Sequence, residues 1–121
     1  MNTAYFETQF ISTLDPEEIP EHAFIITGYN PMDEKLPVKE NQKRNIILED
    51  IIKQAGAHCL PIIGASQDLI HQEPSFVTDL QKAQVIELAK RFNQRAIFEI
   101  RIWIRFLTEG PRSPILQNST E

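Results

Sequence analysis

The sequence contains little of what would mark a disulfide-rich, secreted or membrane-spanning protein. Cys59 is the single cysteine among 121 residues, so no disulfide can form within the chain, and a lone thiol suits a reducing compartment. No apolar run is long enough to cross a membrane, and the first ten residues lack the basic and apolar regions of a signal peptide. We therefore expect a cytoplasmic protein without a membrane partner.

Clustered positive charge is also missing. The 12 Lys and Arg residues are outnumbered by 17 Asp and Glu residues, which gives a net charge of -5. Nucleic-acid binding depends on clustered lysine and arginine, so we expect no nucleic-acid partner.

Motifs that would hold a phosphate or a metal are absent as well. Gly64 stands alone, without the glycine-rich loop that cradles a phosphate. The three histidines lack the spacing of a zinc site; they are His22, His58 and His71. The sequence therefore predicts no metal and no cofactor, and no motif decides whether the protein is an enzyme.

What the sequence does contain is a regular succession of apolar patterns. Strands are expected at residues 4–12, 23–28, 57–64, 69–77 and 95–107, and helices at residues 39–55 and 78–92. The order β-β-α-β-β-α-β predicts an α+β fold, with two helices packed on a single layer of mixed or antiparallel sheet. One domain at residues 1–107 accounts for these elements, and residues 108–121 are expected to form a flexible tail.

Helical and strand periodicity also predict which side chains are buried. The apolar arc of the first helix comprises Ile47, Leu48, Ile51, Ile52 and Ala55, and Gly56 ends that helix. Thr78 and Gln81 have capping-box spacing for the second helix, whose apolar stripe is Val85, Leu88, Ala89 and Phe92 before a left-handed Asn93. In the last strand the even-numbered residues from Phe98 to Phe106 are expected inside, and Trp103 on the opposite face, where a protein partner could meet it.

The stretch from the second strand into the first helix holds most of the candidate site. Arg44 falls in the middle of the apolar arc and Asn41 just inside its edge, so both are expected to point toward the sheet. A buried guanidinium needs an anionic partner, either a carboxylate of the protein or an anionic ligand. Asn45 lies nearer the flank and is expected to contribute less. Asn30 precedes Pro31, which favours an extended backbone and a turn at that point.

Three residues from the second half of the chain complete the candidate. Glu73 and Ser75 share one face of a strand, and Glu73 is the candidate catalytic base or partner of Arg44. Gln94 is interpreted first as a cap for backbone groups and second as a polar group in the same space. Cys59, in an apolar strand, is interpreted as a core residue and not as a nucleophile.

The order of several short segments resembles a known family. These segments are Thr27-Gly28-Tyr29-Asn30-Pro31, Asn41-x-x-Arg44-x-x-x-Leu48, Glu73-Pro74-Ser75 and Phe92-x-Gln94-x-Ala96-Ile97. Together they resemble the signature of a small bacterial family, the domain of unknown function 3293, over about residues 5–97. The resemblance implies a bacterial cytosolic protein and brings no activity with it. The chain departs from the pattern at Gly28, where alanine is expected.

Two functions are compatible with these residues. In the first, Asn30, Asn41, Arg44, Ser75 and Gln94 line a pocket with Glu73 and bind a small anionic or polar ligand. In the second, the same residues form a buried structural network, and the protein is an interaction or regulatory module. An open pocket around Arg44 would favour the first function, and a sealed Arg44–Glu73 pair would favour the second.

Overall fold

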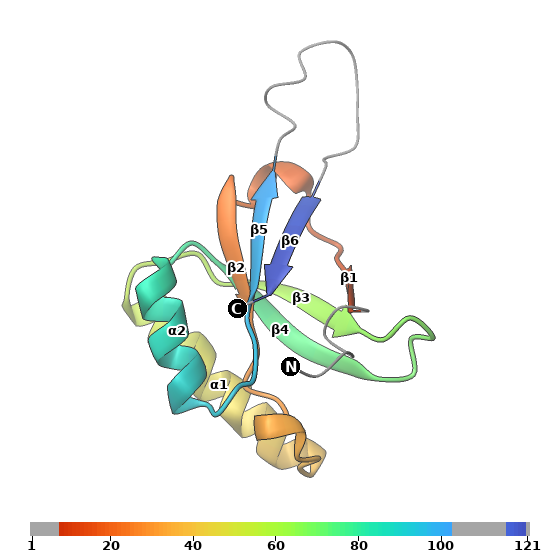
Figure 1. Cartoon of the computed structure of the whole chain (residues 1–121). Helices are drawn as coiled ribbons and strands as arrows, with labels where there is room; N and C mark the ends of the chain where they lie inside the picture. The colour runs from red at the N-terminus through yellow and green to blue at the C-terminus, as the bar shows by residue number, and fades with distance from the viewer. Residues whose placement is uncertain (1–7, 103–115, 121) are drawn as a thin grey trace.

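The fold is a curled antiparallel sheet with two helices on one of its faces (Figure 1). The computed structural model describes residues 8–102 and 116–120. Its elements are β1 (Gln9–Ile11), η2 (Pro16–Glu18), β2 (His22–Ile26), η3 (Pro31–Asp33), α1 (Val38–Gln54), β3 (Leu60–Ala65), β4 (Gln72–Thr78), α2 (Lys82–Arg91), β5 (Phe98–Ile102) and β6 (Leu116–Thr120). The predicted α+β fold and the order β-β-α-β-β-α-β are confirmed, and a further strand, β6, follows the last predicted one.

The strands pair in the order β1-β3-β4-β2-β5-β6, and every pair is antiparallel. The strands β3 and β4 form a hairpin, whereas β2 lies between β4 and β5 and so joins the two halves of the sheet. Strand direction changes strongly across the sheet in Figure 1, as right-handed twist requires when a sheet curls.

The two faces of the sheet have separate cores because successive strand residues point to opposite sides. On the helix face, Phe24, Ile26 and Phe76 pack with Leu48 and Ile52 of α1 and with the α2 stripe. That stripe is confirmed, since Val85, Leu88, Ala89 and Phe92 are all buried. Both helices therefore cover the same side of the sheet.

The second core lies on the concave face and is closed by the curl of the sheet itself. It contains Ile25, Val77 and Ile100, with Phe10 and Phe98 packed against it. The rings of Phe10 and Phe98 meet edge to face with centroids 5.1 Å apart, although three strands separate β1 from β5 in the sheet order. The curl therefore brings two distant strands together across the concave face.

The buried side of α1 differs from the predicted apolar arc. Leu48 and Ile52 are buried as expected, but the other buried residues of the helix are Asn41 and Asn45. Ile47 is 55% exposed, and Ala55 is also exposed. The inward position of Asn41 was predicted correctly. The prediction was wrong for Ile47 and Ala55, because it placed the centre of the arc by hydrophobicity, whereas Asn45 occupies part of the face toward the strands.

Helix boundaries follow the expected stop residues, but one cap was assigned wrongly. Gly56 and Asn93 have positive φ values of 77° and 53° after α1 and α2, as left-handed stops do. The capping box of α2 is formed by Gln81 and Gln84, not by Thr78 and Gln81. Thr78 is instead the last residue of β4.

The alternation predicted for the last strand is confirmed in part within the described residues. Ile100 is buried at 1% exposure and Arg101 is exposed, but Glu99 is partly buried because its carboxylate pairs with His22 of the neighbouring strand. Residues Leu116–Thr120, within the segment expected to be a flexible tail, form β6 along β5. Trp103, Ile104 and Phe106 lie outside the described residues, so the role of Trp103 stays a prediction.

Cys59 lies just before β3 and packs against the helix-side core. Burial raises the pKa of its thiol to about 11. The thiol is therefore protonated at neutral pH, which agrees with a core role and is unsuited to a nucleophile.

Alanine substitutions of two neighbouring residues of α1 test which face of the helix packs against the core. Leu48→Ala should lower the free energy of unfolding by about 2–5 kcal/mol, because it leaves a cavity in the core. The matched control Ile47→Ala should change it by no more than about 0.5 kcal/mol, because Ile47 is largely exposed. Urea denaturation measures both, and comparable losses in the two variants would contradict the observed face.

Candidate functional site

Asn45, the residue expected to matter least, holds the strand ends beside the candidate site. Its side-chain Oδ1 accepts a hydrogen bond of 2.7 Å from the Gly28 backbone N–H, and its Nδ2 donates one of 2.8 Å to the Pro74 carbonyl. Ile26 pairs with Phe76, and the same register continued by two residues would place Gly28 opposite Pro74. The Asn45 amide thus joins the two backbones where the β2–β4 ladder ends.

Gly28 permits this close approach of helix and strand. A Cβ atom at this position would lie 3.0 Å from Asn45 Oδ1 and 3.1 Å from the backbone carbonyl carbon of Arg44. Both distances are shorter than ordinary van der Waals contact between such atoms. Gly28 therefore allows a tight contact between α1 and the segment that follows β2.

Asn30 and Asn41 form a reciprocal amide pair behind Glu73. The Asn30 N–H donates to Asn41 Oδ1 at 2.9 Å, and Asn41 Nδ2 donates to Asn30 Oδ1 at 2.9 Å. Asn30 Nδ2 then donates to Glu73 Oε1 at 3.2 Å. Asn41 is an interior residue of α1, whose N-cap is Pro37. The pair therefore orients the Asn30 amide toward the Glu73 carboxylate.

The backbone at Asn30 is left-handed, with φ 45° and ψ 70°, and not extended as its position before Pro31 predicted. Asparagine tolerates this conformation better than most residues. Its Oδ1 also accepts a hydrogen bond from the Leu36 N–H at 3.1 Å. The side chain therefore closes the loop that follows β2, and these bonds offset the cost of the unusual backbone.

Arg44 points inward, as predicted, but its partners are not anionic. Its Nε donates to the Gly28 carbonyl at 2.6 Å, and its Nη2 donates to the Phe92 carbonyl. The guanidinium carbon also lies 5.5 Å from the centroid of the Phe92 ring. The expected pair with Glu73 is not formed, because backbone carbonyls and an aromatic face solvate the guanidinium. Arg44 therefore links the end of β2 to the end of α2.

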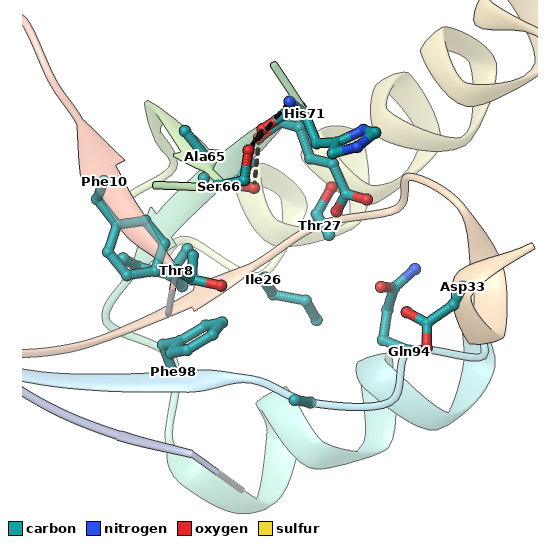
Figure 2. Close-up of a pocket in the computed structure, with 15 residues that line it drawn as sticks. Thr8, Phe10, Ile26, Thr27, Asp33, Ala65, Ser66, His71, Gln94 and Phe98 are labelled. Atoms are coloured by element: carbon teal, nitrogen blue, oxygen red, sulfur yellow. Dashed lines mark hydrogen bonds between the residues drawn. The ribbon is translucent and has the colours of Figure 1, made fainter. Parts of the chain in front are cut away.

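Gln94 combines the two roles proposed for it. Its Nε2 donates to the carbonyls of Tyr29 at 3.0 Å and Phe92 at 3.3 Å, which is the expected cap of backbone groups. The same side chain lines a cavity on the concave face of the sheet, where Figure 2 shows it pointing toward the interior. Its amide nitrogen is thus occupied within the protein, while its oxygen faces the cavity.

The cavity has a volume of about 230 Å³ and two chemically different ends. Phe10 and Phe98 lie at one end, and Gln94 and Asp33 lie at the other (Figure 2). Glu73, Ser75, Thr27, Ser66 and His71 also line it, together with small and apolar residues of the sheet. Because the curl of the sheet brings the Phe10 ring against Phe98 across the concave face, it creates this space.

The Glu73 carboxyl group has an altered electrostatic environment in the cavity. Burial raises its pKa above the ordinary value, and the negative charge of Asp33 raises it further. The Asn30 hydrogen bond and the charge of His71 act in the opposite direction. Such a carboxyl can exchange a proton closer to neutral pH than a solvated one.

The predicted site residues thus divide into two groups. Glu73, Ser75 and Gln94 line the cavity, whereas Asn30, Asn41 and Arg44 lie behind it and hold the loop and the helices in place. Sequence reasoning gave Asn45 too little weight, and it missed Phe10 and Phe98 as cavity walls. Asn41 and Asn45 are one helical turn apart, and this spacing was a usable signal for the role of Asn45. The contact between Phe10 and Phe98 depends on the curl of the sheet, which no local signal indicates.

Neither a metal-binding cluster nor a membrane-spanning helix occurs among the described residues. They contain no group of three or more His, Cys, Asp or Glu side chains placed to hold a metal ion. Within the same residues, no helix combines the length and the apolar character needed to span a membrane.

Fold and site together define a small α+β protein with a cavity on the concave face of a curled antiparallel sheet. The chain belongs to the family described as protein of unknown function DUF3293, whose model matches residues 26–97. The matched segment includes Asn30, Asn41, Arg44, Glu73 and Gln94 but not the two aromatic residues of the cavity wall. No curated protein and no solved structure matches the chain.

Removing the Asn45 amide tests its structural role. Asn45→Ala should lower the free energy of unfolding by about 1–3 kcal/mol, because the Gly28 N–H and the Pro74 carbonyl lose their buried partner. Gln42→Ala, at an exposed position of the same helix, is the matched control and should have little effect. Equal denaturation midpoints for the two variants would show that the bridge contributes nothing.

The raised pKa of Glu73 predicts a pH-dependent effect of Glu73→Gln on stability. A folded-state pKa above the ordinary value of 4.5 means that the native protein binds the proton more tightly than the unfolded chain. Ionisation of Glu73 therefore lowers the free energy of unfolding of the wild type as pH rises through the folded-state pKa. Glu73→Gln should be the more stable protein near neutral pH. The advantage should shrink as pH falls and disappear below the ordinary value.

Urea denaturation across this pH range measures the effect, with Glu87→Gln as the control that removes an exposed carboxylate from α2. The control should show no comparable trend. A stability difference between Glu73→Gln and the wild type that grows as pH falls would reverse the sign and refute the assignment.

Proposed function

We propose that this protein binds a small polar molecule in the cavity of its concave face. The observation that carries the proposal is the cavity itself, in which aromatic walls and polar groups from separate elements face one space of about 230 Å³. Ligand sites commonly combine such apolar walls with a few oriented polar groups. A benzene ring fits a cavity of about 150 Å³, so this cavity suits a molecule of one ring or a short chain with a polar group.

The residues behind the cavity support this function by making it rigid. Asn41 holds Asn30, which in turn orients Glu73, and Arg44 fixes the segments that carry Gly28 and Phe92. A preformed site loses less conformational entropy when it binds a ligand. The buried structural network therefore supports the proposed ligand site, so a structural role and a binding role of these residues are not alternatives.

A cavity-filling variant tests the proposal. Ala96 lines the cavity, so Ala96→Leu should occupy part of it and abolish ligand-induced stabilisation while the protein stays folded. Ala83→Leu, on the exposed side of α2, is the matched control and should bind as the wild type does. A ligand at about 100 times its dissociation constant should stabilise the wild type by about 2.7 kcal/mol.

A thermal-shift screen of metabolites and fragments, followed by calorimetry of the hits, provides the measurement. Hits whose affinity is the same in wild type, Ala96→Leu and Ala83→Leu would place binding elsewhere. A complete absence of stabilising compounds would argue against a binding function.

Contact with a protein partner is the second function, and one observation favours it. Val38, Ile46 and Ile47 of α1 are 64%, 64% and 55% exposed, and apolar side chains gathered on one element often mark an interaction surface. Ala96→Leu separates the two functions, because filling the cavity should leave a contact through α1 intact. Either function is compatible with a bacterial cytoplasm, which the free thiol of Cys59 supports.

A further inference from the structure

Three of the hydrogen-bond donors that line the cavity, Ser75, Thr27 and Gln94, are already used within the protein. Ser75 Oγ donates its proton to the Glu73 carbonyl at 3.0 Å, and Thr27 Oγ1 donates to the Pro74 carbonyl at 2.8 Å. Gln94 donates both hydrogens of its amide nitrogen to backbone carbonyls. A ligand that needs donors from these three side chains would have to break existing bonds.

Acceptors at the same end of the cavity remain available. The Glu73 carboxylate accepts one hydrogen bond from the described residues, that of Asn30 at 3.2 Å, which leaves lone pairs on both of its oxygens. The side-chain oxygen of Gln94 also faces the cavity, since the amide nitrogen is the atom bonded to the backbone. The polar end therefore offers acceptors to a molecule that brings donors.

The charges of the residues that line the cavity also favour a ligand that brings hydrogen-bond donors. Among the described residues that line the cavity, none is lysine or arginine, two are the acidic residues Glu73 and Asp33, and one is His71, whose charge lowers the pKa of Glu73. Asp33 is paired with Arg95 at 2.8 Å, whereas the Glu73 carboxylate has no cationic side chain in contact within the described part of the chain. Arg44, the cation expected to hold an anionic ligand, is bonded to two backbone carbonyls behind the cavity.

The opposite end of the cavity is formed by two aromatic rings, with Thr8 beside them (Figure 2). The Phe10 and Phe98 rings meet at 5.1 Å with an interplanar angle of 78°, and Figure 2 shows both of them away from Gln94 and Asp33. Aromatic rings in this arrangement accept a flat or aliphatic group against their faces and edges. A ligand that spans the cavity thus needs an apolar body and a donating head.

We propose that the cavity binds a small organic cation, in which an ammonium or amidinium group donates hydrogen bonds to Glu73 and Gln94 while a ring or short aliphatic chain lies against Phe10 and Phe98. The inference rests on the proposed function and specifies its ligand class. It replaces the anionic ligand that the sequence suggested. Glu73 then acts as the counter-ion of the ligand.

Three probes of nearly the same size and shape test the ligand class. Benzylamine, benzyl alcohol and benzoate differ mainly in the charge and the donor count of the polar group. Isothermal titration of the wild-type protein near neutral pH should show benzylamine binding about ten- to hundredfold more tightly than benzyl alcohol, and no binding of benzoate. This comparison needs no variant, so it does not depend on the folding of one.

The variant Glu73→Gln identifies the counter-ion. It keeps an acceptor for Asn30 and should weaken benzylamine about ten- to hundredfold while leaving benzyl alcohol nearly unchanged. Glu87→Gln removes an exposed carboxylate of α2 and should change neither affinity. A loss of equal size in both variants would assign the effect to net charge and overturn the role of Glu73.

The outcomes also separate this inference from the proposed function. If benzoate or benzyl alcohol binds as tightly as benzylamine, and Ala96→Leu abolishes that binding, the cavity is a ligand site but the cation inference is wrong. If benzylamine does not bind at all, the cation inference is likewise wrong, and the broader screen decides the proposed function. If benzylamine binds and Ala96→Leu does not affect it, both fail.

Discussion

The Asn45 amide bridges β2, β4 and α1 at the point where the β2–β4 ladder ends, and the candidate site is built around that bridge. Oδ1 and Nδ2 bond to the backbones of Gly28 and Pro74. Strands that part without such a bridge would leave buried backbone groups without partners, at a cost of about 1–3 kcal/mol for each group. The helix therefore supplies the hydrogen bonds that the sheet no longer supplies, and its position relative to the loop after β2 is fixed by them.

Arg44 and Asn41 extend this attachment on either side of the bridge. Arg44 joins the carbonyls of Gly28 and Phe92, so the end of β2 is tied to the end of α2. Asn41 holds Asn30, whose amide meets Glu73. A guanidinium that donates to two carbonyls and lies over a ring avoids much of the penalty of burial without a carboxylate. The Glu73 carboxylate is consequently left to the cavity.

In the proposed function, the same polar cluster serves both structure and binding. Arg44, Asn45 and Gln94 donate hydrogen bonds to backbone carbonyls, whereas the Glu73 carboxylate and the side-chain oxygen of Gln94 lie on the cavity side. Under the proposal, an acceptor-rich ligand would meet these acceptors without donors from Thr27, Ser75 or Gln94. The shape of the cavity comes from the curl of the sheet, and the proposed selectivity follows from the orientation of the Gln94 amide.

Local periodicity was enough to predict the α+β class, the order of strands and helices, the α2 stripe and the left-handed stops at Gly56 and Asn93, because each depends on residues close together in sequence. The shared face of Glu73 and Ser75 followed in the same way from strand alternation. The tertiary structure alone decided that Arg44 meets carbonyls, that Asn45 bridges two strands, and that Phe10 reaches Phe98. These contacts join segments from 16 to 88 residues apart. They depend on where the strands diverge and how far the sheet curls, and no local pattern encodes either quantity.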